Sequence, residues 1–82
     1  MKSVFTDEYR MLLDWLVEKR NQSGLTQQAL SKLLHKPQSY VSKYENAERR
    51  LDVIEFLKIS VLIDADPFEI MPTLIRKLAK NK

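Results

Sequence analysis

Cysteine is absent from the chain, and histidine occurs only once, as His35. Without cysteine the chain can form neither a disulfide nor a thiolate-bound metal site, and this usage fits the reducing cytoplasm, where we expect the protein. There is no Gly-rich phosphate-binding loop and no metal-ligand spacing, and His35 has no partner for a catalytic triad. We therefore expect no enzymatic activity, no cofactor and no metal.

Glycine, proline and long apolar runs are also scarce. One Gly and three Pro among 82 residues leave no linker that would divide the chain, so we expect a single domain over residues 1–82. No stretch approaches the ~18 apolar residues of a membrane span. The acidic residues near the N-terminus interrupt the apolar run that a signal peptide needs. We therefore expect no association with a membrane.

The segment from Thr26 to Arg50 reads as two short helices joined by a tight turn. Thr26 is suited to cap a first helix over residues 27–34. Its apolar side is formed by Ala29, Leu30 and Leu33, and its polar side by Gln27, Gln28, Ser31 and Lys32. Because Pro37 restricts the preceding residue to extended geometry, this helix must end there. Pro is tolerated in a first helical turn, so we expect the second helix to begin at about Pro37 and to reach Glu45 or Asn46.

The second helix needs only Val41 and Tyr44 for its inner face. Its outer face consists of Gln38, Ser39, Ser42, Lys43 and Asn46. Such a face suits the major groove, where Gln can pair with adenine and Lys can donate to guanine. It is also common on a solvated surface helix. Charge favours DNA: five cations and two anions between Lys32 and Arg50 give +3, which equals the net charge of the whole chain.

These residues resemble a known family. The runs GLTQQALSKLL, PQSYVSKYENAERR and RRLDVIEFL together are similar to the helix-turn-helix of the phage repressor and Cro-like (XRE) transcription regulators. The resemblance covers roughly residues 12–68. It implies an all-α fold, a compact five-helix lambda-repressor-like domain with an extra C-terminal helical segment, and a helix-turn-helix at about residues 26–46. It also implies sequence-specific binding of double-stranded DNA.

The same resemblance implies roles for individual side chains. Gln27 would bond a phosphate and brace Gln38 at the start of the recognition helix. The residues facing bases would be Gln38, Ser39 and Lys43, with Tyr40 and Ser42 as further candidates. The residues contacting phosphates would be Gln27, Lys36, Asn46, Arg49 and Arg50. Arg20 would form a structural ion pair with Glu45.

The chain departs from the family at three positions where Gly is usual, namely His35, Ala47 and Asp64. His and Asp adopt the left-handed backbone conformation more readily than Ala does. We therefore expect the loop that follows the recognition helix to differ in shape from the usual one.

Helices are also expected on both sides of this unit. The first should begin after Thr6 and end at Ser23 and Gly24. Its main apolar stripe is formed by Tyr9, Leu12, Leu13, Leu16 and Val17. A second stripe, formed by Val4, Met11 and Trp15, lies on another side and requires a second partner. We expect the C-terminal segment of the same chain to cover it.

The helix that follows Asp52 is apolar on two sides. Asp52 and Glu55 form a capping box, and Val53, Phe56, Ser60 and Ile63 are expected to face the core. The opposite side, which we interpret as an interface, is formed by Ile54, Leu57, Val61 and Leu62.

Asp66 and Pro67 should begin another helix, with a kink or break at Pro72. In the segment of residues 67–80 an apolar stripe is formed by Met71, Leu74, Ile75 and Leu78. This stripe would either pack within the chain or form a homodimer seam.

A homodimer is expected because one recognition helix reads too few base pairs to find a genomic site, whereas two copies read an inverted repeat. We therefore predict a DNA-binding regulator, most simply a repressor. The alternative from another class is an antitoxin or other module that mainly binds a protein, with a toxin or RNA polymerase as the partner. The sequence does not choose among repressor, activator, antitoxin and restriction-modification controller.

Overall fold

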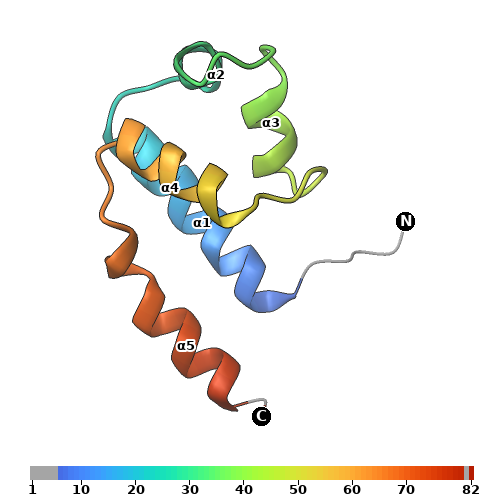
Figure 1. The fold of residues 1–82 in the computed structure, drawn as a ribbon, viewed down its shortest axis with the longest axis vertical. Coiled ribbons are helices and arrows are strands. Elements are labelled where there is room, and N and C mark those ends of the chain that lie inside the picture. Colours follow the sequence, from blue (N-terminus) through green and yellow to red (C-terminus); the bar gives the residue numbers. More distant parts are fainter. Residues whose placement is uncertain (1–5, 81) are drawn as a thin grey trace.

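The computed structural model describes residues 6–80 and residue 82 (Figure 1). It contains α1 (Asp7–Gln22), α2 (Gln27–Leu33), α3 (Tyr40–Glu45), α4 (Val53–Leu62), the 3₁₀ turn η1 (Pro67–Glu69) and α5 (Met71–Lys80). These described residues include five α-helices and no strand, which confirms the predicted all-α fold. Val4, assigned above to the second apolar stripe, lies outside the described residues.

The helices begin where side chains cap them. Thr6 Oγ1 accepts a hydrogen bond from the Tyr9 amide at 3.2 Å, and Thr26 Oγ1 accepts one from the Ala29 amide at 3.0 Å. At α4 the capping box is complete, because Asp52 accepts from the Glu55 amide and Glu55 accepts from the Asp52 amide. Each bond satisfies an amide that has no partner within its helix. The predicted starts of α1, α2 and α4 are confirmed.

Three helices end in a Schellman motif without glycine. His35, Ala47 and Asp64 have φ angles of 58°, 60° and 59°, and each is the second residue after its helix. After α3 the Ala47 amide bonds the Tyr44 carbonyl and the Glu48 amide bonds the Lys43 carbonyl, and the same pair of bonds closes α2 and α4. Ala47 therefore adopts the conformation that Gly would adopt, and the expected change of loop shape is not seen at this residue.

The core forms around α1, and the C-terminal segment covers one side of it (Figure 1). Trp15 is buried, its indole N–H lies 3.4 Å from a Glu69 carboxylate oxygen, and its ring centroid lies 6.3 Å from that of Phe56. Lys19 forms an ion pair with Glu69 at 3.1 Å. The prediction that the same chain covers Trp15 is confirmed.

Two details of the predicted helices are wrong. The recognition helix begins at Tyr40 rather than at Pro37, because residues 37–39 form a turn closed by a bond from the Tyr40 amide to the Pro37 carbonyl. Val53 is 71 % exposed, because it opens α4 and the core contacts of that helix begin one turn later at Phe56.

The C-terminal segment is interrupted, but at Ile70 rather than at Pro72, where the break was predicted. Asp66 caps only the three-residue turn η1, and α5 begins one residue before Pro72, which therefore lies in a first helical turn where Pro is tolerated. Met71 and Leu74 pack against the core, whereas Ile75 and Leu78 are exposed. Only half of the apolar stripe of α5 is thus available to a partner. Within residues 6–80 no helix combines the length and the apolar character that a membrane crossing requires.

Candidate nucleic-acid interface

Ser31 fixes the angle between α2 and α3. Its buried hydroxyl donates to the Gln38 carbonyl and accepts from the Val41 amide, both at 3.2 Å. The prediction that placed Ser31 on the outer side of α2 is therefore wrong. Its hydroxyl satisfies two backbone groups at the turn, and such groups require partners once they are buried. One side chain of α2 thus holds the start of the recognition helix.

A second buried cluster holds the end of the recognition helix. Arg20 Nε donates to Glu45 Oε2 at 2.7 Å and Arg20 Nη2 donates to Glu45 Oε1 at 3.1 Å, so the predicted ion pair is present. A third guanidinium nitrogen donates to the Leu25 carbonyl at 2.8 Å. The bond to the Glu45 carboxylate raises the pKa of Arg20. Because both groups are buried and bonded, α3 is fixed against α1.

Gln27 joins this cluster instead of bracing Gln38. Its side-chain amide donates to Glu45 Oε1 at 2.7 Å, and among the described residues no hydrogen bond links it to the Gln38 side chain. The resemblance implied that Gln27 braces Gln38. That prediction is wrong, because Gln27 bonds Glu45 instead. Gln27 still lies at the surface between α2 and α3, where it lines a shallow hollow of about 500 Å³ together with Gln28, Gln38, Ser39 and Ser42.

The outer face of the recognition unit is polar and accessible. Gln38, Ser39, Lys43 and Asn46 are exposed, and Ser42 is half-buried. On the opposite side Val41 and Tyr44 have no exposed surface. Because the inner residues and the two buried clusters account for the packing, none of the exposed side chains is required for folding. The structure thus brings the predicted base-facing residues together, with the exception of Tyr40.

Tyr40 faces α4 and the loop after α3. It is 7 % exposed, its hydroxyl donates to Glu55 Oε2 at 2.9 Å, and its ring meets the Tyr44 ring edge-on. Burial, and then the bond to Glu55, raises the pKa of Tyr40 to about 12. A side chain held in this way cannot reach a base edge without leaving the core. We therefore exclude Tyr40 from the base-facing set.

The two arginines predicted to bind phosphates, Arg49 and Arg50, differ in their contacts and exposure. The Arg49 guanidinium forms an ion pair with Glu55 Oε2 at 2.8 Å and lies 4.8 Å from the centroid of the Tyr40 ring. Arg50 is exposed, with its guanidinium 4.6 Å from the centroid of the Tyr9 ring. Tyr9 is itself held by the Leu51 amide, which donates to its hydroxyl at 2.9 Å. Arg49 therefore serves the packing of the loop, whereas Arg50 lies at the surface.

Comparisons with known proteins agree with this geometry. A family model described as helix-turn-helix matches residues 16–70. A solved structure of an XRE-family like protein from Pseudomonas syringae pv. tomato str. DC3000 shares 48% sequence identity. The match covers 85% of each chain with a TM-score of 0.78. No curated protein matches the chain. The chain thus belongs to the XRE family of helix-turn-helix proteins, which are DNA-binding transcription regulators.

Proposed function

We propose that this protein is a transcriptional repressor that binds an inverted-repeat operator in double-stranded DNA as a homodimer. The observation that supports this function is the contrast between the two sides of α3. One side is buried and held at both ends, and the other presents exposed amide, hydroxyl and ammonium groups that packing does not use. Rigid elements that present free polar groups are what base readout in the major groove requires.

The proposed base contacts follow from exposure. Gln38, Ser39 and Lys43 face bases, with Ser42 at the edge of the same surface. The phosphate contacts are proposed for Gln27, Lys36, Asn46 and Arg50. Asn46 Nδ2 lies 3.5 Å from the Ser42 hydroxyl, so the two side chains present adjoining polar groups at the end of α3. Arg49 is not among the proposed phosphate contacts, because its guanidinium forms an ion pair with Glu55.

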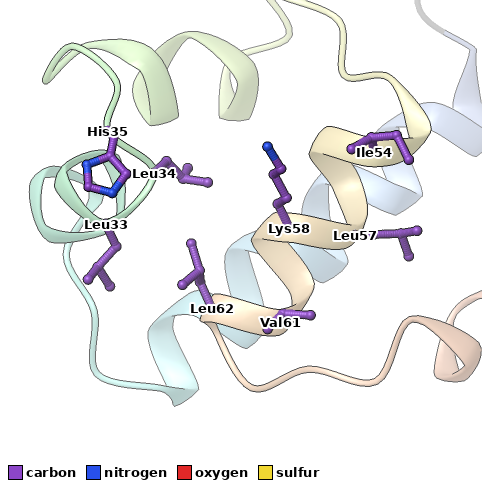
Figure 2. A pocket seen from close by; sticks show the side chains of 8 residues that line it. All are labelled: Leu33, Leu34, His35, Ile54, Leu57, Lys58, Val61 and Leu62. Carbon is purple, nitrogen blue, oxygen red and sulfur yellow. The ribbon is translucent and has the colours of Figure 1, made fainter.

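The proposed homodimer requires a surface, and two of the exposed apolar surfaces are candidates. One is a groove of about 460 Å³ between the end of α2 and the outer side of α4, where Leu62 points toward Leu33 and Leu34 (Figure 2). It is lined by Leu33, Leu34, His35, Ile54, Leu57, Lys58, Val61 and Leu62. The other consists of Ile75 and Leu78 on α5. Both surfaces include residues that the sequence predicted as interface residues, namely the four apolar residues of α4 in the groove and the two residues of α5.

Charge favours the groove as the seam. The segment of residues 70–82 contains Arg76, Lys77, Lys80 and Lys82 and no acidic residue. Two copies paired through α5 would place two basic helices side by side, which is unfavourable. The groove contains only Lys58 as a permanent cation. We therefore place the twofold contact at α4 and leave the exposed side of α5 outside it.

The alternative is a module whose main role is to bind a protein, such as an antitoxin, and the same apolar groove favours it. Salt distinguishes the two functions. Affinity for duplex DNA should fall by roughly one log unit per log unit of salt for each phosphate contacted, whereas an apolar protein contact should change little. Titration of duplex DNA at several salt concentrations is the test. An affinity for DNA that is absent or independent of salt would contradict the proposed function.

A further inference from the structure

We infer that Glu55 competes with the DNA backbone for Arg49 and so limits the affinity of the protein for DNA of any sequence. This inference rests on the proposed function, because it concerns the edge of the same DNA-binding surface. It assigns to Glu55 a role beyond the capping of α4. The carboxylate would act as an internal substitute for a phosphate.

The geometry supports the competition. Arg49 Nη2 lies 2.8 Å from Glu55 Oε2, and Arg49 Nη1 lies 3.1 Å from the Arg50 carbonyl. The Tyr40 hydroxyl donates to the same carboxylate oxygen at 2.9 Å. The guanidinium is therefore held by contacts from the loop, the first residue of α3 and the first turn of α4. A carboxylate and a phosphate present the same kind of oxygen acceptors to a guanidinium.

The position of the pair is next to the proposed DNA surface. Tyr40 is the first residue of α3, and the ammonium of Lys36 lies 5.6 Å from the centroid of its ring. Arg49 is 4.8 Å from the same centroid. Two cations thus flank the start of the recognition helix, and Glu55 neutralises one of them. The Arg49 side chain remains 41% exposed, so an approaching phosphate can reach it.

Arg49 gains little when it exchanges Glu55 for a DNA phosphate, because both partners are charged. The Arg49 guanidinium and the backbone amide of Asp52 hold the pKa of Glu55 at about 2, so the carboxylate is charged at any pH at which DNA is bound. A phosphate that captures Arg49 must therefore replace one charged partner with another and leaves Glu55 facing the DNA backbone. Pairing with Glu55 weakens the contact between Arg49 and a phosphate by the same amount for every DNA sequence. Binding then depends more strongly on the base contacts of α3, which favours specificity.

The test is a double-mutant cycle with Glu55→Gln and Arg49→Gln. Gln keeps the capping box, because it also accepts from the Asp52 amide, so α4 should remain folded. For Glu55→Gln we expect the slope of log affinity against log salt to steepen by about 0.9, which is one phosphate contact. Adding Arg49→Gln to this variant should remove that gain. In the presence of Glu55 the same substitution should change the slope much less.

Glu48→Gln is the matched control, because Glu48 is an exposed acid next to Arg49 in the loop between α3 and α4. It removes the same charge without releasing a guanidinium, so any gain in affinity should not depend on Arg49. An unchanged or shallower slope for Glu55→Gln, or equal effects of Arg49→Gln in both backgrounds, would overturn the inference. Absence of salt-dependent DNA binding by the parent protein would instead overturn the proposed function. Binding should be measured on a random-sequence duplex, with thermal unfolding recorded for every variant.

Discussion

Glu45 is the residue on which the geometry of the recognition helix depends most. It accepts two hydrogen bonds from Arg20 of α1 and one from Gln27 of α2, although it belongs to α3 itself. Three elements therefore meet at one buried carboxylate. Such a group stabilises the fold only while its partners remain, since an unpaired buried charge is costly.

Arg20→Ala tests this dependence. The substitution leaves Glu45 buried without its cation, and we expect the free energy of unfolding to fall by about 3 kcal/mol. Chemical denaturation followed by circular dichroism measures the change. Arg10→Ala removes an exposed arginine from the same helix and should have an effect within about 0.5 kcal/mol of zero. Equal losses from the two variants would refute the structural role of the ion pair.

Gln38 and Arg50 should have separable roles in binding. Gln38→Ala removes an exposed amide proposed to read a base, so the preferred base should change at one position of each half-site. Arg50→Ala should weaken binding to all sequences alike and make the salt slope shallower by about 0.9. Competition binding with a set of single-position operator variants measures both. If both variants lost affinity equally for every operator variant, α3 would not read bases.

The helices of this protein are distinctive at their C-terminal ends, where three of them are followed by a non-Gly residue with a positive φ angle. His35, Ala47 and Asp64 occupy left-handed positions, and a residue with a Cβ atom is strained there. Ala is the least suited of the three, because it has no polar side chain that could bond the local backbone. The loop between α3 and α4 is therefore held in a strained conformation by its contacts, among them the pair of Arg49 with Glu55.

Ala47→Gly should relieve this strain. We expect a gain of about 0.5–1 kcal/mol in the free energy of unfolding, which corresponds to a rise of several degrees in Tm for a domain of this size. The control is Ala29→Gly in the first turn of α2, which should destabilise by about 0.5–1 kcal/mol because Gly disfavours helical backbone. Thermal unfolding of both variants decides the matter. A loss of stability in Ala47→Gly would contradict this expectation and would mean that packing of the Ala47 methyl group against the core outweighs the strain.

The elements also show which features could be predicted from the sequence. Caps are local, so Thr6, Thr26 and Asp52 marked the helix starts correctly, and the inner face of α3 was readable from the spacing of Val41 and Tyr44. The family resemblance supplied the ion pair of Arg20 with Glu45.

Contacts that form only in the folded chain could not be predicted from the sequence. The role of Ser31 depends on two backbone groups of a turn, and no side-chain pattern records their need for partners. Tyr40 and Arg49 are both bonded to Glu55 of α4, and neither bond can be predicted from the order of residues along the chain. Helical periodicity placed Val53 toward the core, but it could not show that the core begins one turn later.

For the whole molecule, the position of the twofold contact determines whether two recognition helices can reach one face of DNA. The groove beside α4 borders the end of α2, and thus the recognition unit (Figure 2). In contrast, α5 lies in a segment that carries four cations and no acid. Half-sites must lie about one helical turn, ~34 Å, apart for both helices to enter successive major grooves. A seam at α4 keeps the contact close to the reading elements.

Val61→Lys tests the proposed seam. Val61 lines the groove and is 76% exposed, so the added charge should not disturb folding but should oppose a second copy. Val53→Lys is the matched control, since Val53 is equally exposed on the same helix but lies outside the groove. Sedimentation should give a monomer for the first variant and a dimer for the second. A parent protein that is monomeric both alone and on DNA would contradict the homodimer.

The most direct measurement is selection of bound sequences from a random duplex pool at about 0.15 M salt, where weak non-specific contacts are screened. We predict recovery of an inverted repeat whose half-sites are separated by about one helical turn, because two copies of α3 would read it. No enrichment of any sequence would contradict the claim that the outer face of α3 reads DNA. The apolar groove would then point to a protein partner as the main ligand.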